Sequence, residues 1–136
     1  MTNIKIKSGG RFEDIGSYSR VRRIGPFVFI AGTTAIEESG KLHQPNDTYA
    51  QTRFILEQME RYLNEVGAEL QHVVRTRGFL TSMADAGQFV KAHGEIFEGI
   101  DPVTAAVEAG LTQQGMMVEI EVDAIIHDEN GAIDFR

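Results

Sequence analysis

Residues 116–126, with the sequence MMVEIEVDAII, alternate between apolar and acidic side chains. Alternation with a period of two is typical of a β-strand whose two faces meet different surroundings. The apolar face carries Met116, Val118, Ile120, Val122 and Ala124, and the acidic face carries Glu119, Glu121 and Asp123. We therefore expect one face of this strand to lie in a hydrophobic core and the other to present a row of carboxylates.

A second strand with two distinct faces is predicted at residues 73–82, VVRTRGFLTS. Alternation places Val74, Thr76, Gly78 and Leu80 on one face and Arg75, Arg77, Phe79 and Thr81 on the other. A row of carboxylates repels itself, and arginines from a neighbouring strand would relieve that repulsion. The polar face of the sheet is therefore expected to meet either water or another subunit.

The rest of the chain predicts a mixed order of strands and helices. Strands at residues 19–24 and 27–32 meet at Gly25-Pro26, which indicates a hairpin, and a surface loop follows at residues 37–47. A long helix is expected from a cap at Asp47 or Thr48, with Thr48 and Gln51 at capping-box spacing, to about Val66, before Gly67. Spacings of three and four place one apolar stripe on this helix, formed by Thr52, Ile55, Leu56, Met59, Leu63 and Val66. A second helix is expected at about residues 84–98, ahead of two closing strands.

The length and composition indicate one domain over residues 1–136, with a polar tail at about residues 128–136. The chain is 42% hydrophobic, enough for one core that needs no metal or disulfide for stability. It has no cysteine, which excludes a disulfide framework, a zinc finger, an iron–sulfur cluster and thiol catalysis, and fits a reducing cytoplasm. No apolar stretch approaches the roughly 18–20 residues of a membrane span, so we expect a soluble, cytoplasmic protein without a membrane partner.

The formal net charge of −7 argues against a nucleic-acid partner, because such binding depends on basic side chains that neutralise phosphates. The tightest basic group is Arg20, Arg22 and Arg23, and it has no interleaved aromatic residue to stack a base. The 4 histidines are scattered, and no pair has the helical spacing of a metal site. We therefore expect neither a nucleic-acid partner nor a bound metal.

Five stretches of the chain occur in the order found in one known family: GSYS at 16–19, FIAG at 29–32, LQHVVRTRGFLT at 70–81, PVT at 102–104 and VEIEV at 118–122. Together they resemble the Rid/YjgF family of reactive intermediate deaminases, also labelled endoribonuclease L-PSP. The resemblance implies an α+β fold of the chorismate-mutase type, with two helices on one face of the sheet. It also implies a homotrimer with a central barrel and ligand clefts between subunits.

The resemblance further implies a chemistry, the hydrolysis of enamines and imines of 2-keto acids to the keto acid and ammonia, without a cofactor. Tyr18 matches a tyrosine that closes the family's cleft, Glu119 matches a glutamate that positions water, and Gly32 belongs to the cleft. Three positions depart from the pattern. Thr104 stands where active members have a carboxylate-binding arginine, Ala106 replaces a small polar residue or cysteine, and Lys91 replaces an asparagine.

These departures leave two hypotheses open. The chain is either a divergent hydrolase acting on an enamine, an imine or a related small carbonyl compound, or a trimeric protein that binds a small carboxylate or carbonyl ligand without turnover. A threonine donates one neutral hydrogen bond, worth about 0.5–1.5 kcal/mol, whereas a charge-assisted bond is worth about 1.5–3 kcal/mol. We therefore expect poor hydrolysis of 2-iminobutyrate.

Each candidate site residue also has a plain structural interpretation. Tyr18 could be an ordinary packed aromatic residue, and Glu119 could pair with Arg75 or Arg77 in an ionic row. Arg77 is the candidate replacement for the missing arginine, although charge balancing is its alternative role. If the resemblance extends to the site, a single pocket will be lined by Tyr18, Gly32, Thr104 and Glu119, with at least one of them from another subunit.

Overall fold

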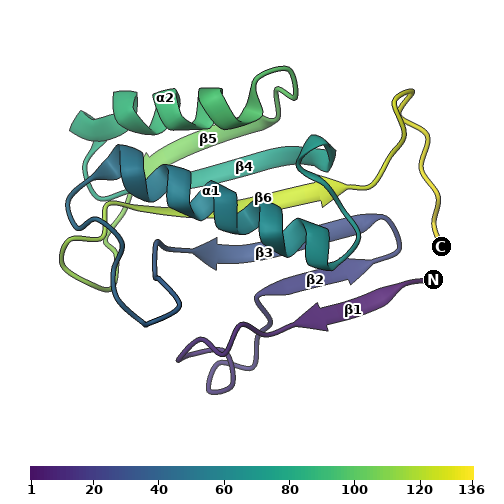
Figure 1. The fold of residues 1–136 in the computed structure, drawn as a ribbon, viewed down its shortest axis with the longest axis horizontal. Coiled ribbons are helices and arrows are strands. Elements are labelled where there is room, and N and C mark those ends of the chain that lie inside the picture. The colour runs from purple at the N-terminus through teal and green to yellow at the C-terminus, as the bar shows by residue number, and fades with distance from the viewer.

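A computed structural model of residues 1–136 shows one mixed sheet of 6 strands in the order β1-β2-β3-β6-β4-β5 (Figure 1). The strands are β1 (Asn3–Ile6), β2 (Val21–Ile24), β3 (Phe27–Thr33), β4 (Val73–Leu80), β5 (Val103–Glu108) and β6 (Val118–Ile125). All neighbouring pairs are antiparallel except β4 and β5, which are parallel. The edge strand β5 therefore follows a crossover connection from β4, and that connection contains a helix.

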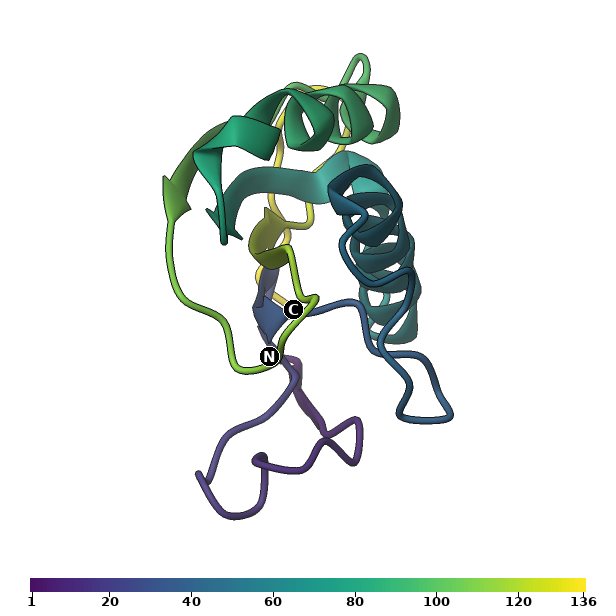
Figure 2. The same ribbon diagram turned by 90° about the vertical axis from the view of Figure 1, so that its left-hand side faces the viewer.

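Both long helices, α1 (Thr48–Glu65) and α2 (Ala86–Phe97), cover the same face of the sheet (Figures 1 and 2). Two short 3-10 helices, η1 (Leu70–His72) and η2 (Met83–Asp85), precede β4 and α2. The α+β fold expected from the sequence is confirmed. We call the face of the sheet away from the helices the open face. No helix is both long enough and apolar enough to span a bilayer.

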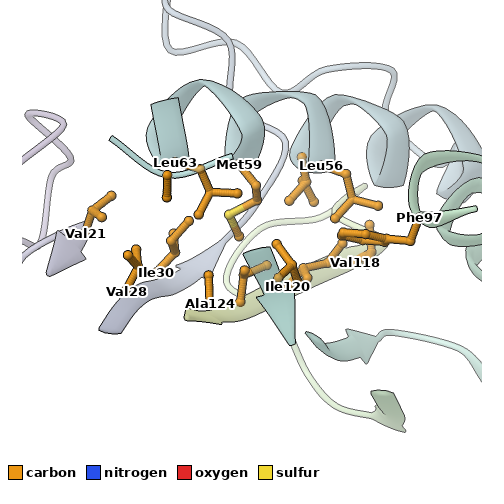
Figure 3. Close-up of a cluster of buried hydrophobic side chains, with 14 of the residues drawn as sticks. Val21, Val28, Ile30, Leu56, Met59, Leu63, Phe97, Val118, Ile120 and Ala124 are labelled. Carbon is orange, nitrogen blue, oxygen red and sulfur yellow. The ribbon is translucent and has the colours of Figure 1, made fainter. Parts of the chain in front are cut away.

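The core lies between the helices and the apolar face of β6, as the alternating pattern predicted (Figure 3). Val118, Ile120, Val122 and Ala124 are buried there, and α1 contributes Ile55, Leu56, Met59 and Leu63 from one stripe. Removing this apolar surface from water is the main favourable contribution to folding. The acidic residues of β6 consequently point to the open face.

The cap of α1 differs in part from the prediction. The Asp47 side chain accepts a hydrogen bond from the backbone N–H of Ala50 at 2.9 Å, so Asp47 is the N-cap. Gln51 is buried and makes no capping box with Thr48, because its amide donates to the carbonyls of Gln44 and Gly115. The side chain of Gln51 therefore ties the loop before α1 to the loop before β6.

One other local expectation is corrected, and two features of the fold were not anticipated. A bulge between Val73 and Arg75 places Val73, rather than Val74, in the core. The short strand β1 was not predicted, because 4 residues give too little alternation to distinguish a strand from a loop. The polar tail is held against the start of the chain, since the backbone N–H of Thr2 donates to the carbonyl of Arg136 at 2.8 Å.

Candidate functional site

Glu119 of β6 lies on the open face beside Gly32 of β3. Its neighbour Ile120 is buried, and Glu119 is paired in register with Phe79 of β4. Gly32 lies in a bulge of β3, and a Cβ atom added there would lie 3.0 Å from the carboxyl carbon of Glu119. The missing side chain of Gly32 therefore makes room for the carboxyl group of Glu119.

The carboxyl group of Glu119 is half-buried, and its pKa is shifted. Burial raises the pKa above the usual value of a glutamate, the charge of Glu121 raises it further, and the charge of Arg20 lowers it by a smaller amount. Glu119 is in no ion pair with Arg75 or Arg77. A carboxyl group that holds its proton more readily is suited to giving and taking protons closer to neutral pH.

Arg20, for which the sequence pattern indicates no role in the site, connects this site to the preceding loop. Its Nη1 atom donates to the carbonyl of Gly32 at 2.5 Å and to Oγ1 of Thr33 at 3.2 Å. Its Nε and Nη2 atoms each lie 3.4 Å from Oε2 of Glu13. The guanidinium group therefore fixes the backbone of β3 beside Glu119.

Glu13 is the anchor of Arg20, and its side chain is only 1% exposed. Burial alone would raise the pKa of Glu13, but hydrogen bonds from the side chain and backbone of Ser8, together with the charge of Arg20, lower it below the usual value. The carboxylate is thus ionised and buried at the base of the loop. Sequence reasoning had no signal for this pair, because neither helical nor strand spacing relates two residues within an irregular loop.

Tyr18 lies at the end of the same loop and has a half-exposed ring. The guanidinium carbon of Arg20 is 5.8 Å from the ring centroid, within reach of a cation–π contact. The preceding Ser17 has a φ of 58°, in the left-handed region that non-glycine residues rarely adopt. Tyr18, Arg20, Gly32 and Glu119 therefore form one group, which joins three of the predicted site residues.

Thr104 lies elsewhere, on the edge strand β5, and its side chain is on the helix side of the sheet. It is paired in register with Thr76 of β4, which is fully buried, and Oγ1 of Thr76 donates to Oγ1 of Thr104 at 2.7 Å. Ala106 is on the same face and packs partly against the core. Thr104 and Ala106 thus form a second group. Within one copy of the protein, this group lies apart from Tyr18 and Glu119.

Arg77 is held in ion pairs on the open face. Its Nη1 atom lies 3.1 Å from Oδ2 of Asp123 and 3.5 Å from Oε1 of Glu121. Within one chain, Arg77 therefore balances the acids of β6, as its alternative interpretation required. Arg75 is exposed and makes no ion pair.

A hollow of about 220 Å³ lies at the β4–β5 edge, lined by Arg75, Thr76, Arg77, Val103, Thr104 and Ala105. A larger hollow of about 310 Å³ over α1 includes none of the predicted site residues. Lys91 lies on the outer side of α2, with its Nζ atom 5.2 Å from the centroid of the Tyr49 ring. No cluster of three or more histidine, aspartate or glutamate side chains is arranged to hold a metal ion.

The comparison with known proteins extends over most of the chain. The family model described as Endoribonuclease L-PSP matches residues 9–126. A RutC family protein of Pyrococcus abyssi is 31% identical over 111 residues, which cover 81% of this chain and 87% of that protein.

Two solved structures show the same fold. Rv2704 of Mycobacterium tuberculosis, described as a member of the YjgF/YER057c/UK114 family, is 39% identical, with 92% of this chain and 100% of that chain covered and a TM-score of 0.82. YyfA of Yersinia pestis, described as a protein of unknown function of the Rid family, is 28% identical, with coverage of 92% and 100% and a TM-score of 0.79.

Proposed function

Because the chain belongs to the Rid/YjgF family, described also as Endoribonuclease L-PSP, we propose that it is a hydrolase of a small imine, enamine or related carbonyl compound. The reaction takes place in a cleft between two subunits of a homotrimer. The observation that carries the proposal is the state of Glu119, a half-buried carboxyl group with a raised pKa, beside a glycine that leaves space for it.

The proposed reaction adds water across the carbon–nitrogen double bond. Glu119 takes a proton from the attacking water as the new carbon–oxygen bond forms and passes it to the imine nitrogen, which gives a carbinolamine. Glu119 then takes the hydroxyl proton of the carbinolamine and passes it to the nitrogen as the carbon–nitrogen bond breaks, so that ammonia departs and a carbonyl compound remains. A single carboxyl group can serve as base and then as acid when its pKa lies closer to the working pH.

The neighbours of Glu119 hold the reacting groups in position. Arg20 fixes the carbonyl of Gly32 and the adjacent backbone, which supports a stable distance between Glu119 and a bound water. Tyr18 covers the same region with a ring that is half-exposed in a single chain. In the proposed trimer, the edge strand β5 of another subunit, with Thr104 and Ala106, completes the cleft opposite them.

A ribonucleic acid substrate is disfavoured by the net charge of −7, because phosphate binding depends on clustered basic side chains. Two of the three arginines near β2 are also occupied by protein groups. Arg20 contacts Glu13, and Arg23 donates to the carbonyls of Gly25 and Val66.

The experiment that tests the proposal measures ammonia released from a panel of imines generated in the assay, including 2-iminobutyrate and imines without a carboxylate. We expect Glu119→Gln to lower the rate by about 100-fold or more, within the range of a lost general acid–base group. Glu121→Gln is the matched control, because it removes an acid two residues away on the same strand face. Equal losses in the two variants would contradict the role of Glu119.

A non-catalytic binding function is the second candidate, and one observation favours it. Thr104 is uncharged and Ala106 is packed partly against the core, so this edge of the sheet carries no fixed cation on the helix side. Under this alternative, the trimer binds a small carbonyl or carboxylate compound without releasing ammonia. Saturable binding that is equal in the wild type and Glu119→Gln, with no turnover of any imine in the panel, would favour it.

A further inference from the structure

A direct chain of hydrogen bonds crosses from α2 through β4 to the edge strand β5. Nε2 of His93 lies 2.8 Å from Oγ1 of Thr76, and Oγ1 of Thr76 donates to Oγ1 of Thr104 at 2.7 Å. Both distances are those of ordinary hydrogen bonds, with no gap for a bridging water. This hydrogen-bond chain begins at the half-buried ring of His93 and ends at the exposed Thr104.

The surroundings of His93 keep its ring in one place. The rings of Phe89 and Phe97 lie on either side along α2, with centroids 5.6 and 4.7 Å from that of His93. Phe89 can lie against β4 only because Gly78 has no side chain, since a Cβ atom there would be 2.7 Å from the Phe89 ring. Burial lowers the pKa of His93, which favours the neutral ring at physiological pH.

The single hydroxyl proton of Thr76 can serve only one of its two hydrogen bonds. We assign that proton to the bond with Thr104, in which case Nε2–H of His93 donates the bond to Thr76. Thr104 accepts one bond and keeps its own hydroxyl proton for another acceptor. Because Thr104 is exposed, a ligand can supply that acceptor.

We propose that His93 and Thr76 are positioning residues that direct the hydroxyl group of Thr104 to donate a hydrogen bond to an uncharged carbonyl or amide oxygen of the ligand. This inference rests on the function proposed above and names the substrate class of the same cleft. The ligand is a neutral 2-oxo or 2-imino compound, such as an amide, rather than a free acid. Thr104 touches the ligand, and His93 acts only through Thr76.

The charges around the β4–β5 edge support an uncharged ligand. The hydrogen-bond chain contains no cation, because burial favours a neutral His93 ring. Arg77 is already paired with Glu121 and Asp123. Arg75 is the one rival, since it shares the 220 Å³ hollow and makes no ion pair, but its side chain belongs to the opposite face of β4 from Thr76.

The test compares 2-oxobutanamide with 2-oxobutyrate, two probes of similar size that differ in charge. Dissociation constants are measured by nuclear magnetic resonance titration of the full chain. We expect the amide to bind about 10-fold more tightly than the acid, since a carboxylate loses its hydration without gaining a cation. If the acid binds more tightly than the amide, or if Arg75→Gln loses acid binding, the inference is overturned in favour of an anion site at Arg75.

Variants separate positioning from packing. The substitution Thr76→Val keeps the shape of the side chain but removes the hydroxyl group that links His93 to Thr104. We expect it to weaken amide binding by about 3- to 10-fold, whereas Thr76→Ser, which keeps a hydroxyl group, should bind the amide as the wild type does. Thr48→Val is the matched control, because the hydroxyl of Thr48 is buried without any hydrogen-bond partner. If Thr76→Val and Thr48→Val bind the amide equally well, the hydrogen-bond chain has no role in binding.

A spectroscopic measurement tests the hydrogen-bond chain without any ligand. Nitrogen-15 spectra of the free protein should show His93 as the neutral Nε2–H tautomer, and Thr76→Val should shift its Nε2 resonance. A neutral Nδ1–H tautomer would reverse the donors and overturn the assignment. If the acid binds near Glu119 and its binding does not depend on Thr104, this inference alone is overturned. If neither probe binds and no imine is hydrolysed, the proposed function is overturned as well.

Discussion

Thr104 and Glu119 project from opposite faces of the same sheet. Thr104 is paired with Thr76, whose side chain is buried under the helices, whereas Glu119 follows the buried Val118 and lies on the open face. A small ligand cannot contact both side chains within one copy of the chain. If both belong to one cleft, they must come from different subunits, as we propose.

Assembly is the first prediction. We expect a homotrimer in which the open faces of the subunits meet. The reason is that Phe29, Val103 and Val107 are exposed apolar side chains on or beside the ion pairs that Arg77 makes with the acids of β6. Sedimentation equilibrium at micromolar concentration should give the mass of three chains. A stable interface of this kind buries on the order of 2,000 Å² or more, so dissociation should coincide with unfolding. A monomer at that concentration would contradict the prediction.

The contact between Gly78 and Phe89 gives a stability prediction. A Cβ atom at Gly78 would lie 2.7 Å from the Phe89 ring, so Gly78→Ala should destabilise the fold by about 1–3 kcal/mol. Gly94→Ala is the matched control in α2, because nothing lies within 4 Å of its added Cβ. That control should stabilise the helix by about 0.5–1 kcal/mol. Urea unfolding of both variants measures the difference, and effects of the same sign would contradict the packing described here.

The buried pair of Glu13 and Arg20 gives a third prediction. Arg20→Ala leaves Glu13 buried without its cation and removes a donor from the carbonyl of Gly32, so we expect a loss of about 2–3 kcal/mol in unfolding free energy. Lys7→Ala is the control in the same loop, since it breaks an exposed ion pair with Asp14. We expect no measurable change from that variant. Similar losses in both variants would show that Glu13 is not the anchor of the loop.

The buried His72 and the half-buried His93 predict how stability depends on pH. Burial lowers the pKa of His93, and burial together with the charge of His127 lowers that of His72. Below the ordinary histidine pKa of about 6.5, the unfolded chain binds protons that the folded chain does not, so the unfolding free energy should fall as pH decreases from 7 to 5. The double variant His72→Gln/His93→Gln should show a shallower slope in urea titrations across that range. Identical slopes would contradict this assignment.

The sequence predicted the parts of the fold that depend on local periodicity. The alternation in β6 identified its buried face correctly, and the spacing of Ile55, Leu56, Met59 and Leu63 identified the core side of α1. Both patterns reflect burial of one side of a regular element. Local periodicity failed where a strand is irregular, at the bulge in β4 that buries Val73 in place of Val74.

The candidate site was harder to predict, because it depends on contacts between distant segments. Tyr18, Gly32 and Glu119 were proposed as site residues through the family resemblance, and the structure brings them into one region. Arg20 and Glu13 were missed, since their pairing depends on the path of an irregular loop. The hydrogen-bond chain from His93 to Thr104 was also missed, because it needs the register of β4 with β5 and the position of α2 above them.

Cross-linking between subunits tests most directly whether Tyr18 and Thr104 face each other across one cleft. The chain has no cysteine, so Tyr18→Cys and Thr104→Cys can be made in separate chains, mixed by refolding and treated with a short bismaleimide. A linker is preferable to a disulfide, which requires Cα atoms within about 7 Å. We predict covalent dimers in the mixture and not in either variant alone. A mixture that assembles into trimers but yields no cross-linked dimer would contradict a cleft built from two subunits.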